Sequence, residues 1–261
     1  MKLGMIGGFT AQNFDYVKSK NLSFIEICRN YDNEAEDFIA AVEDVKRNID
    51  RTGITIASVG RWNAKPNAAG KLDEEVIEKN IRLMDAAHAV GAPVFVTGCN
   101  ADDSISLYKN YTAAIAYFSR MLEEADKRGM KLAVYNCHWE NFVYSAPQWE
   151  VVLGELPELM IKFDPSHAFY RREDYLGELR TWGKRVAHMH VKGSVFVNGT
   201  RLDDPPAGMD QIDWRSLFAV LYANHYDGGL SIEPHSGIWK GDLAEPGVDF
   251  TINYIRPFIV R

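Results

Sequence analysis

Three segments in the second half of the chain share one design: LMIKFDPSH at 159–167, VAHMHVKG at 186–193 and GLSIEPH at 229–235. Each begins as an apolar run typical of a buried strand and ends in carboxylate or imidazole side chains. Asp164, His190 and Glu233 are residue types that bind a divalent metal through oxygen and nitrogen. Three separate strands must therefore end at one place, and a closed barrel has that property.

Five further apolar runs precede these three: KLGMIGG from 2, FIEIC from 24, ITIASVG from 54, PVFVTG from 93 and KLAVYN from 131. Helical periodicity is found between runs, over residues 34–52, 73–90 and 111–128, and a glycine follows each of these segments. Eight strands alternating with helices in about 250 residues predict an α/β fold, a (β/α)8 TIM barrel, with residues 1–261 as a single domain. The alternative is an open doubly wound sheet, but its GxGxxG fingerprint does not occur in the sequence.

Composition excludes several classes of protein. A formal net charge of −7 disfavours binding to nucleic acid, which depends on a basic surface. No apolar run approaches the roughly 18 residues of a membrane span. The three cysteines, Cys28, Cys99 and Cys137, form no CxxC pair, so we expect a reduced, cytoplasmic compartment.

Side-chain alternation along a strand predicts which polar groups share a face. We expect His190 and Lys192 at the mouth of the barrel, with His188 on the same face but deeper. Glu233 should share a face with His235, and Asp164 should end its strand with His167 one turn beyond it. A single histidine is more often structural than functional, and His88 and His225 are interpreted in that way. Acid or imidazole at the ends of three of the last four strands predicts a metal or catalytic site.

These motifs resemble those of the xylose-isomerase-like TIM-barrel superfamily of sugar phosphate isomerases and epimerases, with its inosose isomerases, inosose dehydratases and ketose 3-epimerases. Asp164 and His167 match the D-x-x-H of its sixth strand, His190 and Lys192 the H-x-K of its seventh, and Glu233 the glutamate of its eighth. The resemblance implies one Mn²⁺, Co²⁺, Mg²⁺ or Zn²⁺ ion, held by residues from strands five to eight. It also implies a small carbohydrate substrate and a possible homo-oligomer.

The fifth strand departs from the family pattern, because AVYNCHWENF at 133–142 has Tyr135 or Asn136 where a metal-binding glutamate is usual. An imidazole binds Mn²⁺, Co²⁺ or Zn²⁺ better than a neutral amide does. We therefore predict His138 as the fourth ligand, beside Asp164, His190 and Glu233. The predicted catalytic groups are Glu233, His138 and Glu140.

An epimerase of this kind uses two carboxylates on opposite sides of the substrate, one to remove a proton and one to return it. The main prediction is a divalent-metal-dependent sugar isomerase or epimerase that acts on a small carbohydrate or keto-polyol through an enediolate. The alternative is a dehydratase or lyase acting on the same substrates, which the loss of the strand-five glutamate favours. A DNA-repair nuclease like endonuclease IV is disfavoured by the acidic charge and few histidines. A non-catalytic sugar-binding barrel remains open because of the missing glutamate.

Other residues near the predicted strand ends are candidates for contact with the sugar: His167, Lys192, His235, Asn136, Trp62 and Trp139. Flat aromatic faces suit the apolar face of a sugar ring, and the polar groups suit its hydroxyls. Glu26 lies within an apolar strand, and one step of register decides whether it points into the barrel. The sequence leaves open whether it simply pairs with Arg29 or with a lysine of the barrel.

Overall fold

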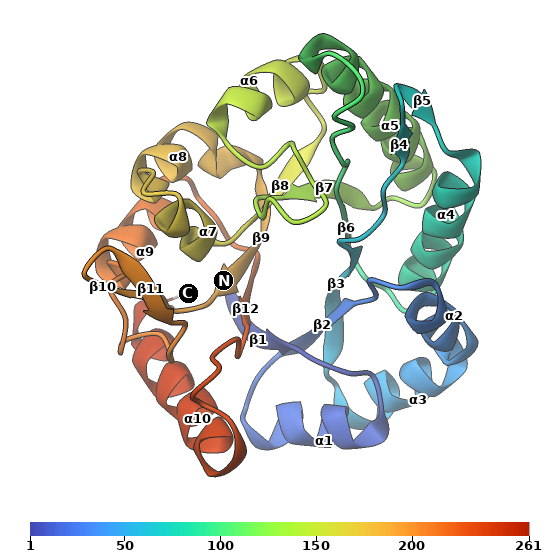
Figure 1. Ribbon diagram of the computed structural model, residues 1–261. Helices are drawn as coiled ribbons and strands as arrows, with labels where there is room; N and C mark the ends of the chain where they lie inside the picture. Colours follow the sequence, from blue (N-terminus) through green and yellow to red (C-terminus); the bar gives the residue numbers. More distant parts are fainter. Residues whose placement is uncertain (261) are drawn as a thin grey trace.

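The computed structural model describes residues 1–260, and it confirms the predicted TIM barrel (Figure 1). The barrel strands are β1 (Lys2–Ile6), β2 (Phe24–Cys28), β3 (Thr55–Arg61), β6 (Val94–Thr97), β7 (Lys131–Tyr135), β8 (Met160–Phe163), β9 (Val186–Val191) and β12 (Gly229–Ile232). They close in the order β1-β12-β9-β8-β7-β6-β3-β2, and every neighbouring pair is parallel. All eight strand ends therefore open at the same mouth.

Helices form an outer ring around the strands (Figure 1). The α-helices are α1 (Ala11–Ser19), α2 (Asp32–Ala40), α3 (Val42–Thr52), α4 (Glu74–Ala89), α5 (Leu107–Lys127), α6 (Ala146–Glu155), α7 (Pro165–Tyr170), α8 (Tyr175–Trp182), α9 (Trp214–Ala223) and α10 (Ala244–Ile255). Short 3₁₀ turns are η1 (Gly183–Arg185), η2 (Gly241–Leu243) and η3 (Arg256–Phe258). Two small hairpins, β4 (Asn67–Ala68) with β5 (Lys71–Leu72) and β10 (Val195–Val197) with β11 (Thr200–Asp203), lie in the connections after β3 and β9. Within residues 1–260, no helix combines the length and apolar character needed to cross a membrane.

Two of the three predicted helices are confirmed. The helix predicted over 73–90 is α4, and the one predicted over 111–128 is α5, which begins four residues earlier behind its Ser106 cap. The prediction of a single helix over 34–52 was wrong. Ala41 takes φ −92° and ψ 4°, and its N–H bonds back to Asp37 and Phe38, which separates α2 from α3. The predicted end of this segment at Gly53 is confirmed, because Gly53 takes φ 76° and caps the C-terminus of α3.

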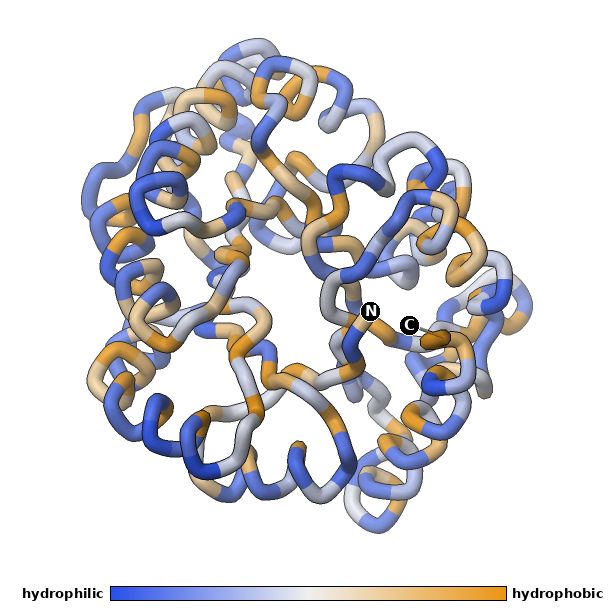
Figure 2. Tube along the Cα trace, turned by 180° about the vertical axis from the view of Figure 1, so that it is seen from behind, coloured by the Kyte–Doolittle hydropathy of each residue, from blue (hydrophilic) through white to orange (hydrophobic). Residues whose placement is uncertain are grey.

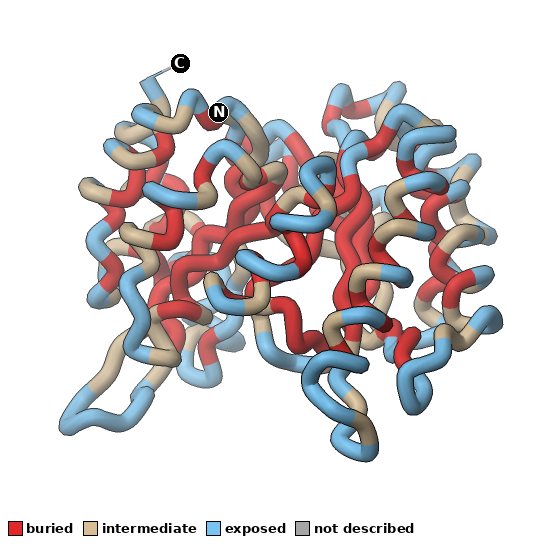
Figure 3. Tube along the Cα trace, turned by 90° about the horizontal axis from the view of Figure 1, so that it is seen from above, coloured by how far each residue is buried: buried red, intermediate tan, exposed pale blue. Residues whose placement is uncertain are grey.

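The strands are the most buried part of the chain, whereas the outer turns and the projecting loops are exposed (Figure 3). Apolar and polar residues alternate along the outer helices, as expected for helices that cover a barrel with one face (Figure 2). Between strands and helices lies a large apolar core that includes Trp149, Phe163 and Trp214. A second, smaller cluster gathers side chains of β6 and β7 with Trp62, which follows β3.

The part of the barrel interior away from this smaller apolar cluster is polar. Glu26 on β2, Lys162 on β8 and the histidines His188 and His190 on β9 are all buried. Burying a charged side chain in a barrel interior costs free energy unless the charge is paired or binds a ligand. The polar half of the interior is therefore where the site must be sought.

Candidate active site

The end of β8 is shaped by FDPSH. Asp164 caps the N-terminus of α7: its Oδ1 accepts the N–H of Ser166 at 2.9 Å, and Pro165 occupies the first helical turn. This cap holds the side chain in one orientation. The second oxygen, Oδ2, is left to face Lys192 and His190 inside the barrel.

Asn136 holds the backbone of Asp164 from the adjacent strand. Its side-chain Nδ2 donates to the Asp164 carbonyl at 2.8 Å, and its Oδ1 accepts the Asp164 N–H at 2.9 Å. The amide is fully buried and does not line the cavity described below. The structure therefore does not place Asn136, predicted to bind substrate, at the cavity: its Nδ2 and Oδ1 both bond to the Asp164 backbone.

Three of the four predicted metal ligands come together. Asp164, His190 and Glu233 each place one ligand atom within 4.8 Å of the other two. His190 Nδ1 lies 3.2 Å from Glu233 Oε2 and 3.8 Å from Asp164 Oδ2. One nitrogen and two carboxylate oxygens suit Mn²⁺, Co²⁺ or Zn²⁺, so this group fits a divalent ion.

Lys192 shares these oxygens. Its Nζ lies 2.9 Å from Asp164 Oδ2 and 2.9 Å from Glu233 Oε2, so an incoming ion would compete with the ammonium for both. Burial opposes charge on either carboxyl, but Lys192 and the neighbouring histidines together outweigh burial and hold the pKa of Asp164 and of Glu233 well below the ordinary value. His167 Nε2 lies 3.4 Å from the same ammonium, and burial together with Lys192 lowers the pKa of this imidazole well below its usual value.

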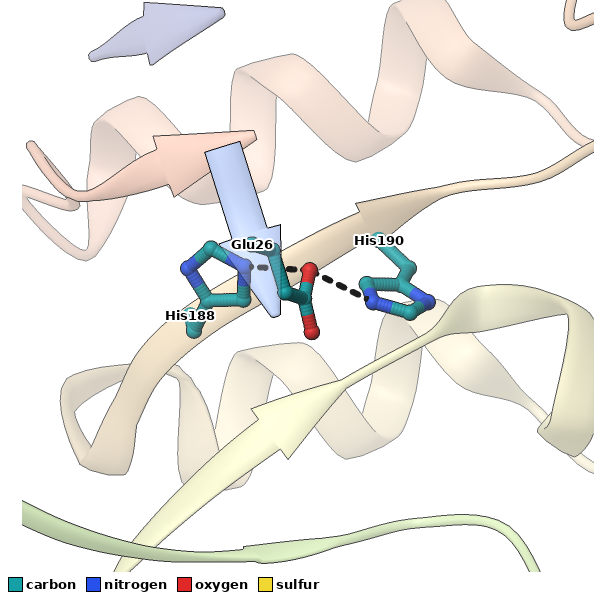
Figure 4. A group of neighbouring side chains, drawn as sticks. All are labelled: Glu26, His188 and His190. Carbon is teal, nitrogen blue, oxygen red and sulfur yellow. Dashed lines mark hydrogen bonds and ion pairs between the residues drawn. The ribbon is translucent and has the colours of Figure 1, made fainter. Parts of the chain in front are cut away.

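Glu26 is the residue whose position the sequence left open, and it points into the barrel (Figure 4). Its Oε2 lies 2.8 Å from Nε2 of His188 and 2.8 Å from Nε2 of His190. Nε2 of His190 is held by this carboxylate, so its Nδ1 is turned toward Asp164 and Glu233, and a metal bound there would replace the proton on Nδ1. A carboxylate behind a histidine in this way fixes the tautomer and ring orientation of a metal ligand. Within the described residues, Glu26 forms no ion pair with Arg29 or with a lysine of the barrel, which was the simpler interpretation.

The charges of this trio depend on each other. Burial alone would raise the pKa of the Glu26 carboxyl, but His190 and His188 outweigh burial and hold it well below its ordinary value. For His190, burial opposes the charged form, yet Glu26, Glu233 and Asp164 together override burial and raise the pKa to about 10. Glu26 and His190 thus form a buried ion pair, and His188 bonds to the same carboxylate oxygen.

A cavity of about 430 Å³ opens above these residues at the barrel mouth. The predicted residues that line it are Trp62, His138, Trp139, His167, Lys192, Glu233 and His235. His235 is half exposed and its Nδ1 lies 3.0 Å from Asp204 Oδ2. Lys162, Tyr170 and Arg201 also line the cavity. Of the three ligand-type side chains, Glu233 therefore lines the cavity itself, opposite a mixed aromatic and cationic wall.

The strand-five predictions are only partly supported. His138 lies in the loop after β7, exposed, with its ring against Tyr144, and is not one of the three grouped ligand residues. The structure does not bring it to the position of a fourth ligand. Glu140 forms an ion pair with Lys65 at 3.0 Å and does not line the cavity. The structure therefore does not bring Glu140, predicted as a catalytic group, to the cavity.

Two residues of the interior were missed or left open, Lys162 and Glu26. Lys162 stands two residues before Asp164 in MIKFD, so strand alternation alone would have placed both on the inward face. Glu26 offered no such indication. Its strand is buried on both faces, and periodicity cannot tell the inside of a barrel from the helix side when both are apolar.

Comparison with known proteins agrees with this geometry. A model of the xylose isomerase-like TIM barrel family matches residues 14–254. The chain belongs to this family. It is 30% identical over 125 residues to an inosose dehydratase of Clostridium perfringens, a match covering 42% of this chain and 42% of that relative. The matched part is thus less than half the length of the curated relative.

Solved structures of the family share the whole fold. A 3-keto-D-glucoside 4-epimerase from E. coli superposes with a TM-score of 0.78 at 17% identity, covering 98% of this chain and 99% of the other. A D-psicose 3-epimerase, solved in the presence of D-fructose, gives a TM-score of 0.80 at 15% identity, covering 99% of each chain. At such identities the likeness establishes the fold, and the chemistry must be argued from the residues.

Proposed function

We propose that this protein is a divalent-metal-dependent dehydratase or lyase that acts on a keto-sugar or keto-polyol. The observation that carries the proposal is the makeup of the cavity wall, where Glu233 is the one carboxylate among the described residues 1–260. Epimerisation by two opposed carboxylates needs a second one on the far wall. Elimination of water needs one base and a separate acid. The partial likeness to an inosose dehydratase supports the same choice.

Asp164, His190 and Glu233 would hold the metal, which when bound supplies a Lewis acid that polarises the carbonyl and hydroxyl oxygens of the substrate. Glu233 Oε2 faces His190 and Lys192, and no hydrogen bond or ion pair within residues 1–260 engages its Oε1. Oε1 is therefore available to take the proton next to the carbonyl. The Glu26 carboxylate keeps the His190 ring in place during this step.

The leaving hydroxyl needs a proton from the other side. His138 lies on the cavity wall after β7, three strands away from β12, the strand that leads to Glu233. As Glu233 takes the C–H proton, the bonding electrons form the new double bond. The C–O bond then breaks, and the hydroxyl departs as water with a proton from the His138 imidazolium. Trp62 and Trp139 on the same wall offer flat faces to the sugar.

A second candidate is epimerisation, the reaction expected first from the sequence. The position of His138 favours it, because an imidazole across the cavity from Glu233 can also return a proton to the opposite face of an enediolate. The two reactions differ in their products rather than in their first step.

The test is an incubation of purified protein with Mn²⁺ or Co²⁺ in D₂O, with keto-sugars and 3-keto-glycosides as substrates. Dehydration gives a product lighter by one water, whereas epimerisation gives a product of unchanged skeleton with deuterium at the inverted carbon. Glu233→Gln should abolish either activity while the circular dichroism spectrum stays that of the wild type. Near wild-type turnover in this variant would refute Glu233 as the base. Failure of the protein to bind any divalent ion would refute both reactions.

A further inference from the structure

Lys162 is a buried cation for which the fold provides no carboxylate. Its side chain is 2% exposed, on the inward face of β8, level with Tyr135 of β7 and His188 of β9. No carboxylate oxygen of the described residues 1–260 lies within ion-pair distance of its Nζ. That atom stands 5.4 Å from the centre of the Trp62 ring.

The acids nearby are already engaged. Glu26 is held by two histidines, Asp164 and Glu233 share Lys192, and Asp204 contacts His235. A buried ammonium whose neighbour is an aromatic ring still lacks a counter-ion, and a ligand anion can supply one. Lys162 lines the cavity, so an anion bound there would replace lost solvent with a direct ion pair.

The charges of the wall point the same way. Lys162, Lys192 and Arg201 line the cavity, against Glu233 alone. Lys192 has two carboxylates beside it, Asp164 and Glu233, and Arg201 packs its guanidinium over the Tyr170 ring, 3.9 Å from Asp204. Lys162 is thus the cation of this wall whose charge is left to a ligand.

We propose that Lys162 binds a carboxylate of the substrate, so that the substrate is a carboxylated keto-sugar or keto-polyol. This deepens, and rests on, the function proposed above for the same cavity. A carboxylate fits better than a phosphate, because a phosphate dianion is usually bound by several donors together, and here a single ammonium faces a tryptophan ring. The anionic end would lie beside Trp62, and the keto end would face Glu233.

The experiment compares two ligands that differ in one group. L-sorbose and 5-keto-D-gluconate have the same keto-polyol skeleton, with a hydroxymethyl group in the first and a carboxylate in the second. Their binding to full-length protein is measured by calorimetry at neutral pH, with wild type, Lys162→Met and the control Lys2→Met. Lys2 is exposed at the opposite end of the barrel, at the start of β1.

We expect 5-keto-D-gluconate to bind wild type and Lys2→Met at least about tenfold more tightly than L-sorbose, the effect of one charge-assisted contact. Lys162→Met should abolish this preference and leave the affinity for L-sorbose unchanged. Equal affinity of the two ligands for wild type, or no binding of either, would overturn the proposal. An undiminished preference of Lys162→Met for 5-keto-D-gluconate would also overturn it. That result is expected if the lysine stabilises only a negative charge that develops during turnover. Because binding is measured without turnover, a failure of the proposed reaction would leave this result readable on its own.

Discussion

Replacing Glu26 with glutamine removes one charge from the barrel interior while keeping the size of the side chain. The carboxylate is fully buried, and its Oε2 accepts from Nε2 of both His188 and His190 at 2.8 Å. Glutamine can still offer one oxygen to these nitrogens, so the change weakens the contacts without opening a cavity. The substitution therefore isolates the electrostatic part of the interaction.

The expected cost follows from the two contacts. A hydrogen bond to a charged group is worth about 1.5–3 kcal/mol and a neutral one about 0.5–1.5, so two weakened bonds cost at least about 2 kcal/mol. Loss of one partner from a buried ion pair costs about 3–5 kcal/mol, which sets the upper end. The free energy of unfolding should therefore fall by about 2–5 kcal/mol, and Tm by at least about 4 °C for a chain of this size.

Urea unfolding followed by circular dichroism at pH 7 measures this loss. The matched control is Glu36→Gln, which also removes a carboxylate held through two contacts, at 2.7 and 2.8 Å to Arg82, but with both side chains about half exposed on the outer helices α2 and α4. An ion pair near the surface contributes little, so this control should lose about 1 kcal/mol or less. Glu26→Gln should also weaken Mn²⁺ binding by about 10–100-fold, measured by electron paramagnetic resonance, whereas the control should not. A stability within about 0.5 kcal/mol of wild type, the usual effect of a surface substitution, would refute the reasoning.

Two further predictions concern stability. Asn136→Leu removes both hydrogen bonds to the Asp164 backbone and leaves buried peptide groups unpaired, so the free energy of unfolding should fall by about 2–4 kcal/mol in urea titrations; an unchanged midpoint would contradict the positioning role. Burial, opposed by Arg171, raises the pKa of Glu178 to about 7 in the folded protein, so the folded state binds its proton more tightly than the unfolded state does. The free energy of unfolding should therefore fall as pH rises from about 4.5 through 7, by up to about 3 kcal/mol. Glu178→Gln should be more stable than wild type at pH 8 but not at pH 4. The same Tm difference between variant and wild type at both pH values would contradict this.

The barrel could be predicted from local pattern alone. Eight apolar runs, separated by helical periodicity and closed by glycine, polar or proline stops, leave few topologies open, because parallel strands need crossovers and crossovers have one hand. The ends of those runs also located the site, since a barrel brings all its strand ends to one mouth. Asp164, His190 and Glu233 were predicted to meet in this way, and they do.

The loop after β7 could not be predicted as well. His138 and Glu140 lie beyond the end of the strand, where side-chain alternation no longer applies, and one is turned to Tyr144 while the other is paired with Lys65. The break between α2 and α3 at Ala41 likewise follows no residue that usually ends a helix. In both places the local sequence permits several conformations, and contacts with the rest of the molecule select one.

The interior charges depended most on the tertiary structure. The sequence alone showed that β8, β9 and β12 end in metal-binding residue types, because residue type and strand period are local properties. It could not show that Glu26 of β2 meets His188 and His190 of β9, more than 160 positions away. Nor could it show that Lys192 takes both nearby acids and leaves Lys162 without one. Which charges pair depends on distances across the closed barrel, and closure is a property of all eight strands together.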